Sequence, residues 1–290
     1  MTASVRKIAK ILTGGQSGVD RAALDFAIEH EIPYCGWCPK GGWAEARVCQ
    51  DNVLKAIAES DLSRNVTIKG GVVMRSITGN IRRATQDMDL DFIRYSLNED
   101  AIRQFIDKLN CLEGIFIKIT GKIEELSQQE YRGKRVYVVL EDDTGHSFKS
   151  KIDLGVHKNI QVAQDEYCFD VCLDDEGASL LINSKEQIFA EKLRSLLRFG
   201  PLSTRYKDIF DLCYLTEYVD RERLQDCLKT YILDDEKMRE NDMDAVRRRI
   251  SRTFGNRTYR SNVEGSEKAN WLRIKMAVAF DRIESFLKTL

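Results

Sequence analysis

Apolar positions follow two rhythms along this chain. Up to Ser179 they gather in short runs separated by helical stretches, and after Ser179 nearly all of them recur at helical spacing. The spacing within residues 48–60 predicts a helix, whereas acidic and apolar residues alternate over residues 87–92, which is typical of a half-buried strand. Further strands are predicted at residues 7–12, 66–69, 115–123, 134–140, 147–154 and 168–172, with a short apolar segment at residues 32–36. Further helices are predicted at residues 19–29, 72–78, 99–110, 185–199, 207–216, 221–231, 243–253 and 267–290.

These elements indicate an α+β fold in which a mixed-sheet part precedes a helical part. A loop is predicted at Asp174-Asp-Glu-Gly177, between the two parts, and the hairpin signal Glu141-Asp-Asp-Thr-Gly145 joins two of the strands. The composition changes near residue 45, since two of the three prolines precede it. We therefore expect three units, residues 1–46, 47–176 and 177–290.

The composition is that of a folded protein. Hydrophobic residues make up 43% and charged residues 31% of the 290 residues, which excludes a disordered chain. The 45 basic residues balance 46 acidic ones, so no overall positive field attracts nucleic acid, and such a contact needs a local patch. There is no apolar run near the ~20 residues that span a bilayer, no signal peptide and no dense cysteine framework. We expect no membrane partner, and a cytoplasmic location with reduced thiols.

Three aspartates share one face of the strand predicted at residues 87–92. Residues two apart in a strand point the same way, so Asp87, Asp89 and Asp91 project together. Like charges on one face repel, and a divalent metal such as Mg²⁺, which prefers oxygen ligands, would compensate them. The upstream pair Gly70-Gly71 lets backbone amides approach a triphosphate closely. These features indicate metal-assisted nucleotidyl transfer, and the alternative is an exposed edge strand with acidic gatekeepers.

Two motifs carry a resemblance to a known family. One is Lys69-Gly-Gly followed by Arg75, and the other is Thr85-Gln-Asp87-Met-Asp89. The glycine pair and the paired aspartates resemble the pattern of polymerase-beta-type nucleotidyltransferases, and the closer similarity is to the AbiEii-type toxin branch. Later motifs follow in the order of that branch. They are Lys151-Ile-Asp153-Leu, Ala190-Glu-Lys192-Leu, and Arg205-Tyr-Lys207-Asp208-Ile-Phe-Asp211-Leu, so the resemblance covers roughly residues 50–290.

The resemblance implies a nucleotidyltransferase mixed-sheet domain followed by a helical bundle. It makes Asp87, Asp89 and Asp153 the metal ligands, with Mg²⁺ (or Mn²⁺) as cofactor and an NTP as substrate. The catalytic residues that it implies are Asp87, Asp89, Asp153 and Lys192. The nucleotide-binding residues that it implies are Lys69, Gly70, Gly71, Arg75, Thr85, Lys192, Arg205, Lys207 and Asp208. From the residues alone, Asp153 is equally well an exposed strand acid, and Lys192 a snorkelling surface lysine.

The resemblance also implies a biological role. Proteins of this kind act as the toxin of a bacterial toxin–antitoxin or abortive-infection system, with a separately encoded antitoxin as partner. The acceptor of the nucleoside monophosphate would be RNA, particularly tRNA.

A glycine-rich loop precedes these motifs. The pattern over residues 12–24 predicts a strand, a Gly-Gly-Gln-Ser-Gly loop and the start of a helix. Backbone amides at the N-terminus of such a helix can bind phosphate. With Gly36-Trp-Cys-Pro-Lys-Gly41, this segment resembles the opening of the putative molybdenum-cofactor carrier family. We expect a short, partial Rossmann-like piece that packs on the remainder. The alternative function is a nucleotide- or pterin-binding protein that uses this loop on a non-catalytic transferase fold. Cys35 and Cys38 lack a second cysteine pair, so no zinc site is predicted.

One concentrated basic stretch occurs near the C-terminal end. It consists of Arg247, Arg248, Arg249, Arg252, Arg257 and Arg260, with Phe254 and Tyr259 between them. Such a cluster can bind phosphates in a salt-dependent way while its aromatic residues stack on unpaired bases. The alternative is a solvated helix face. The three histidines share no spacing that indicates a catalytic or metal site.

Overall fold

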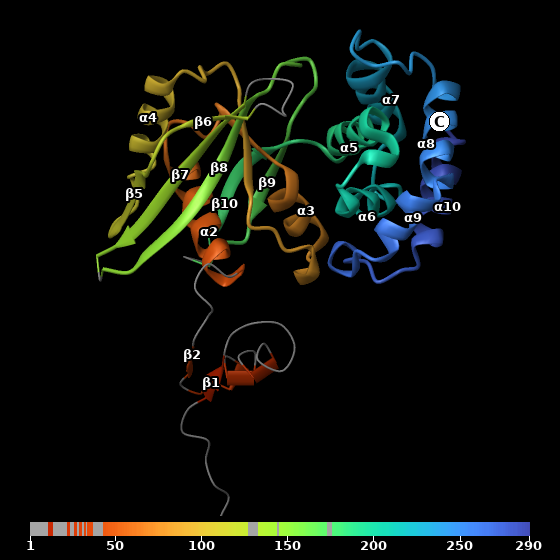
Figure 1. The fold of residues 1–290 in the computed structure, drawn as a ribbon. Coiled ribbons are helices and arrows are strands. Elements are labelled where there is room, and N and C mark those ends of the chain that lie inside the picture. The colour runs from red at the N-terminus through yellow and green to blue at the C-terminus, as the bar shows by residue number, and fades with distance from the viewer. Residues whose placement is uncertain are drawn as a thin grey trace, which may run out of the picture.

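A computed structural model describes residues 43–126, 133–143, 145–172 and 176–290 of the protein, and in addition residues 11–13, 22–23, 26–27, 29–30, 32 and 34–36. Its sheet and its helical bundle lie side by side (Figure 1). Two short strands, β1 (Ile11–Thr13) and β2 (Tyr34–Gly36), pair in parallel apart from the main sheet. The glycine-rich loop at residues 14–18 and the stretch 37–42, both singled out from the sequence, lie outside the described residues.

Eight of the described strands form one mixed sheet, in the order β5-β7-β8-β4-β3-β10-β9, with β6 also paired to β7. The β4–β8 and β3–β10 pairs are parallel and the other pairs are antiparallel. The strands are β3 (Val66–Lys69), β4 (Met88–Phe92), β5 (Ile115–Ile119), β6 (Glu124–Leu126), β7 (Gly133–Asp142), β8 (Ser147–Val156), β9 (Asp165–Phe169) and β10 (Ala178–Ile182). The acidic strand β4 is therefore central, which contradicts the alternative that it is an exposed edge.

The strands predicted at residues 66–69, 87–92, 115–123, 134–140, 147–154 and 168–172 correspond to β3, β4, β5, β7, β8 and β9, but β6 and β10 were not predicted. Most of β10 follows Ser179, in a stretch that we expected to be almost wholly helical, yet its burial alternates as in a strand. Leu181 and Ile182 pair with Thr67 and Ile68 of β3. The boundary predicted after residue 176 therefore comes before the last strand of the sheet.

Three helices pack on the sheet. The longest, α2 (Trp43–Glu59), contacts β8 and β10; α3 (Gly70–Thr78) contacts β3 and β4; and α4 (Glu99–Lys108) contacts β5. The helical half consists of α5 (Lys185–Phe199), α6 (Tyr206–Leu215), α7 (Arg221–Leu228), α8 (Met243–Gly255), α9 (Arg257–Glu264) and α10 (Met276–Leu287), with short helical turns η1 (Ile81–Arg83), η2 (Gly200–Leu202), η3 (Lys229–Leu233) and η4 (Glu267–Ala269). None of the helices in the described part combines the length and apolar character that crossing a membrane requires.

The helix predicted at residues 267–290 is wrong in its first part. The chain forms only η4 there, and α10 starts at Met276. The side chain of Asn270 accepts a hydrogen bond from the Ile274 amide and donates one to the Ile274 carbonyl, and Arg273 has a φ of +54°. Such side-chain bonds to the backbone compete with a helix. The resulting turn directs Trp271 into the core, where it is 2% exposed.

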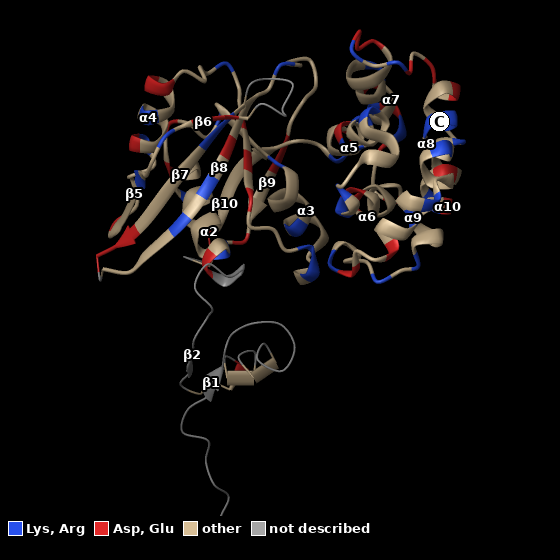
Figure 2. Ribbon diagram, in the orientation of Figure 1, with Lys and Arg blue, Asp and Glu red and all other residues tan. Residues whose placement is uncertain are grey.

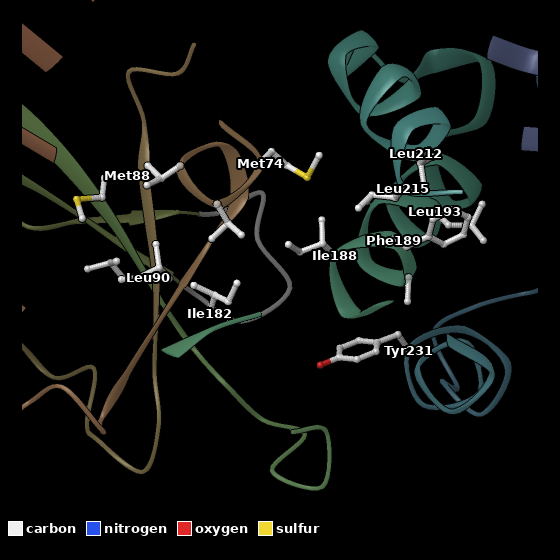
Figure 3. Packing of buried hydrophobic residues seen from close by; sticks show 14 of the residues in the cluster. Met74, Met88, Leu90, Ile182, Ile188, Phe189, Leu193, Leu212, Leu215 and Tyr231 are labelled. Carbon is white, nitrogen blue, oxygen red and sulfur yellow. The ribbon is translucent and has the colours of Figure 1, made fainter. Parts of the chain in front are cut away.

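The two halves share one apolar core. Figure 3 shows Met74 of α3 and Ile188 of α5 lying between the sheet residues Met88 and Leu90 and the helical bundle. All four side chains belong to the same buried cluster, which continues through α6 and α10. Because apolar contacts stabilise roughly in proportion to the area removed from water, this shared core fixes the helical half against the sheet.

A buried ionic cluster reinforces that contact. Asp211 of α6 is 0% exposed and accepts two hydrogen bonds from Arg83, at 2.6 and 2.7 Å. Lys192 of α5 lies 2.8 Å from the same carboxylate, and the indole of Trp271 donates to it at 2.9 Å. Burial alone would raise the pKa of Asp211, but Lys192 and Arg83 lower it to about 2.

Asp211→Asn should lower the free energy of unfolding by about 3 kcal/mol at neutral pH, because two buried cations then lose their shared anion. Urea unfolding of the wild type and the variant measures this difference. Asp107→Asn, at an exposed position of α4, is the matched control and should unfold like the wild type. Equal unfolding free energies for Asp211→Asn and the wild type would contradict the cluster's role.

The dependence of the unfolding free energy on acidic pH gives a second prediction. The folded-state pKa of Asp211 lies below the ordinary value of 3.8, so its contribution is fully present above that pH and is lost as the pH falls towards about 2. The wild type should therefore lose more unfolding free energy over this window than Asp211→Asn does. Denaturant unfolding at a series of acidic pH values tests this, and parallel profiles would contradict it.

Candidate active site

Strand register gathers the residues that the sequence singled out. Lys69 at the end of β3 lies opposite Asp89 of β4, and Asp89 lies opposite Asp153 of β8. Asp87 comes immediately before β4. The sheet therefore places Lys69, Asp89 and Asp153 in one row across three adjacent strands, although residues 69 and 153 are far apart in the sequence.

The two predicted turn glycines begin helix α3. Gly70 has a φ of +68°, and a Cβ atom there would lie 2.3 Å from Oδ2 of Asp89. A Cβ atom on Gly71 would lie 2.6 Å from Oγ1 of Thr85. Glycine is thus required because α3 starts directly against these two side chains. The free amides and positive dipole end of a helix N-terminus can bind an anion, which places such a site beside Asp89.

Basic side chains pair with two of the three aspartates. Lys151 lies 2.7 Å from Asp87, and Arg135 donates two hydrogen bonds to Asp153, both at 2.7 Å. Asp153 is 8% exposed, so the alternative of a simple exposed strand acid does not hold. Among the described residues, no three acidic, histidine or cysteine side chains are grouped as a metal site would group them.

Asp89 is the electrostatically strained member of the row. Burial raises its pKa, Asp153 and Asp87 raise it further, and Lys69 opposes them. A carboxylate that is held beside two others in a partly buried place is a suitable ligand for a hard divalent cation, which would remove this repulsion. The oxygen-only donor set of Asp87, Asp89 and Asp153 therefore fits Mg²⁺ or Mn²⁺ in its chemistry.

Lys69 has a partner that the sequence did not reveal. Its ammonium lies 2.6 Å from Asp91, which is 6% exposed. A Cβ atom at position 155 would lie 2.1 Å from Oδ1 of Asp91, so Gly155 makes room for this carboxylate. Burial would lower the pKa of Lys69, but Asp91 and Glu191 outweigh it and raise the pKa. Lys69 is therefore held as a cation in the wall of the site.

Lys192 is a buried residue, and the alternative of a snorkelling surface lysine is contradicted. It is 7% exposed and lies 2.6 Å from Asp208 and 2.8 Å from Asp211. Asp208 also pairs with Arg205 at 2.8 Å. Asp208 and Asp211 thus hold Lys192 in place, as their spacing on one helix face predicts.

The remaining predicted nucleotide-binding residues divide into two groups. Arg205, whose side chain is 65% exposed, and Lys207, which donates to the Ala84 carbonyl at 3.2 Å, lie beside Asp89 and Thr85 in the same cavity. Arg75 lines none of the cavities found in the described part.

Arg75 is 5% exposed and points to α2. It donates to the Gln50 side chain at 2.8 Å, and Gln50 in turn donates to the backbone carbonyl of Thr85 at 3.1 Å. The structure therefore places Arg75 behind the site, where it holds the loop before β4, and not in contact with the space that a nucleotide would occupy.

Two cavities meet at Asp89, the central residue of the row. They share Gly70, Asp89, Lys192, Arg205 and Asp208 in their walls. The larger has a volume of about 750 Å³ and extends past Gly71 and Thr85 towards Lys268. The smaller, about 260 Å³, extends past Lys69, His157 and Tyr231 towards Arg198. Helices α5 and α6, which carry both basic and acidic residues (Figure 2), form the wall opposite the sheet.

The basic stretch at residues 247–260 differs from the prediction. Phe254 is 2% and Tyr259 is 0% exposed, and the Phe254 ring stacks on Phe280 with centroids 3.9 Å apart. These aromatic residues belong to the core and cannot stack on unpaired bases. The arginines alternate with them because α8 and α9 each turn one apolar face inwards.

Sequence reasoning assigned no role to Lys151, Arg135 or Glu191, and it grouped Asp91 with the metal-binding aspartates. Lys151 has a usable signal, because it is two residues from Asp153 on the same strand and so shares its face. Arg135 meets Asp153 only through the β7–β8 register. Asp91 and Glu191 act through Lys69, and no sequence spacing connects them to it.

Comparison with protein families agrees with this geometry. Residues 52–281 match the family described as nucleotidyl transferase AbiEii toxin, Type IV TA system. Residues 11–71 match the circularly permutated YpsA SLOG family, in the segment for which the sequence indicated a resemblance to a cofactor carrier. No curated protein is similar enough to count as a relative of this chain.

Solved nucleotidyltransferases are distantly similar. An antigenic nucleotidyltransferase-like protein from Paracoccidioides brasiliensis has 15% identity over 73% of this chain and 92% of its own, with a TM-score of 0.42. The antibiotic-resistance factor ANT(2'')-Ia has 14% identity over 65% of this chain and 91% of its own, with a TM-score of 0.40. The family match covers most of the chain and includes every element of the candidate site. The chain therefore belongs to the AbiEii family of toxins and is a nucleotidyltransferase.

Proposed function

We propose that this protein transfers a nucleoside monophosphate from an NTP to a hydroxyl of an RNA acceptor such as a tRNA, with Mg²⁺ or Mn²⁺ and with release of pyrophosphate. The observation that carries the proposal is the row Lys69–Asp89–Asp153 at the start of α3, whose central residue Asp89 lines two cavities. Two cavities that share the Asp89 carboxylate and the Lys192 and Arg205 cations offer separate places for a donor and an acceptor.

Asp87, Asp89 and Asp153 would hold the metal. When bound, it would neutralise the phosphate oxygens and favour the ionised form of the acceptor hydroxyl. Lys151 and Arg135 have to share or release Asp87 and Asp153 for these carboxylates to serve as ligands. The two cations therefore balance the site when no metal is present.

The larger cavity suits the triphosphate. The first amides of α3 at Gly70 and Gly71, together with Arg205 and Lys207, supply the positive end of a dipole and two cations around it. Burial lowers the pKa of Lys207, and an anionic ligand would restore it. The Lys192 ammonium, which Asp208 already orients, adds a fixed positive charge to the wall of this cavity. Most of this positioning is in place before the nucleotide binds, so little reorganisation opposes in-line attack.

The acceptor lies on the other side of Asp89. The smaller cavity is lined by the carboxylates of Asp89, Asp91, Glu191 and Asp208, and Asp153 lies opposite Asp89 in the strand register. Asp153 would assist removal of the hydroxyl proton as the oxygen attacks the α-phosphorus and pyrophosphate leaves. The proposed setting is a bacterial cytoplasm, where a cognate antitoxin restrains the toxin.

The direct test is incubation of the full-length protein with each labelled NTP, Mg²⁺ and total RNA. Label on RNA supports the proposal. Tight nucleotide or pterin binding without any transfer would instead support a binding protein that uses the N-terminal glycine-rich loop.

Asp89→Asn should abolish transfer and at the same time raise the melting temperature without metal. A carboxyl group whose pKa is raised on folding opposes folding at neutral pH, where it must ionise, and the amide removes this penalty. Transfer assays and thermal unfolding at pH 7 measure both effects. Near-normal transfer, or a folded state less stable than the wild type, would contradict the assignment, and Asp107→Asn serves as the control.

Arg205→Gln should weaken NTP binding by roughly 10- to 100-fold, which is the range of a lost charge-assisted hydrogen bond. The side chain is largely exposed, so the fold should remain intact. Isothermal titration with each NTP measures the affinity, with Arg103→Gln on α4 as the matched control. Unchanged affinity would remove Arg205 from the triphosphate site and leave Lys192 and Lys207 as its cations.

A further inference from the structure

A third cavity, of about 530 Å³, lies in the helical half between α5, the segment at residues 237–240 and α8. Six of its lining residues are basic, and Glu240, which is 8% exposed, is the only acid in its lining. The basic residues are Arg198, Lys237, Arg239, Arg248, Arg249 and Arg252. A protein with a net charge of −1 has thus concentrated positive charge at one hollow.

Several of these charges are unneutralised. Arg239, Arg248 and Arg252 are exposed, and within the described residues none of them forms an ion pair. Arg248 and Arg252 are four residues apart on α8, a spacing at which like charges destabilise a helix. By contrast, Arg247 on another face of the same helix pairs with Asp244 at 2.6 Å. The charge repulsion is therefore confined to the face that lines the cavity.

One arginine is built into the cavity wall. Arg249 donates to the Leu197 carbonyl at 3.1 Å. A Cβ atom at Gly200, which has a φ of +51°, would lie 2.6 Å from the Arg249 guanidinium, so glycine is required where α5 ends. The arrangement ties α8 to the end of α5 and fixes the basic face beside it.

This basic cavity adjoins the candidate active site. Arg198 lines both the third cavity and the smaller active-site cavity, and Phe199 lines the latter. The Phe199 ring is 46% exposed, and the Arg198 guanidinium lies 5.6 Å from its centroid. An exposed aromatic ring next to a basic cavity is an arrangement that can hold single-stranded nucleic acid, in which bases stack and phosphates pair with arginines.

We infer that the third cavity binds backbone phosphates of the acceptor RNA, and that a base stacked on Phe199 leads its end into the smaller cavity. This inference rests on the proposed function, because it identifies which side of Asp89 receives the acceptor. An acidic protein segment would also be attracted by the arginines, but it has no group that requires the exposed ring. The observations therefore favour a nucleic acid.

The test is fluorescence anisotropy of a labelled oligouridylate of about 16 nucleotides with the full-length protein over a range of KCl concentrations. Arg248→Gln/Arg252→Gln should weaken binding and reduce the slope of log affinity against log salt by about 1.4, the value for two lost single-strand phosphate contacts. Arg248→Lys/Arg252→Lys should retain most of the slope, because the charges remain. Phe199→Leu should weaken binding on the order of tenfold with the slope unchanged.

The control is Arg103→Gln/Lys122→Gln, which removes the same net charge from exposed positions near α4 and β5. It should leave both affinity and slope unchanged. An equal loss of slope in this control, or an unchanged slope in Arg248→Gln/Arg252→Gln, would overturn the inference. Stronger binding of a labelled poly-glutamate peptide than of the oligonucleotide would also overturn it and would assign the cavity to an acidic protein.

A separate readout distinguishes this inference from the proposed function. NTP affinity of Arg248→Gln/Arg252→Gln should equal that of the wild type, because neither arginine lines the cavity assigned to the triphosphate. Arginine-dependent oligonucleotide binding without any nucleotidyl transfer would refute the proposed function and leave the binding site standing. Transfer to RNA at the wild-type rate in Arg248→Gln/Arg252→Gln and in Phe199→Leu would support the proposed function and refute the inference about the third cavity.

Discussion

The carboxylate of Asp211 is the contact on which the arrangement of the two halves depends. It is fully buried and receives hydrogen bonds or charge from Arg83, Lys192 and Trp271, which come from the sheet half, α5 and the turn before α10. An unpaired charge at such a buried position would cost much folding free energy. The folded state therefore requires all three partners to be in place. Because Lys192 also lines both active-site cavities, the same interaction that joins the halves positions the site between them.

Close backbone approach is the second constraint. α3 begins against Asp89 and Thr85 with no room for a Cβ atom at either Gly70 or Gly71. This geometry explains the glycine pair without reference to a ligand, and it also presents the helix amides beside the acidic row. Backbone packing and anion binding thus both require glycine at these two positions. A substitution tested only by its effect on activity would not distinguish the packing role from the binding role.

Sequence reasoning succeeded where the information is local and failed where it depends on distant partners. The alternation over residues 87–92 and the helical spacing over residues 185–199 predicted β4 and α5 closely, because each segment buries one face of its own. Strand β10 was missed because its short apolar run directly precedes a helical region, although its antiparallel partner β9 is near in the sequence; only its other partner, β3, lies more than a hundred residues away. Arg75 shares a motif with the glycines but points to α2, and no spacing within the motif indicates the direction of a side chain.

Charges of one sign are grouped at two places in this protein, although its acidic and basic residues are nearly equal in number. Burial and the neighbouring Asp153 and Asp87 raise the pKa of Asp89, and the basic cavity places Arg248 and Arg252 four residues apart on one helix face. Each group costs folding free energy that a ligand of opposite charge would return, so stability and binding are linked at both places. A metal and its nucleotide would relieve the first group and RNA phosphates the second. The two groups are connected through α5, on which Lys192 lies beside the acids and Arg198 lines the basic cavity, so one helix carries residues of both places.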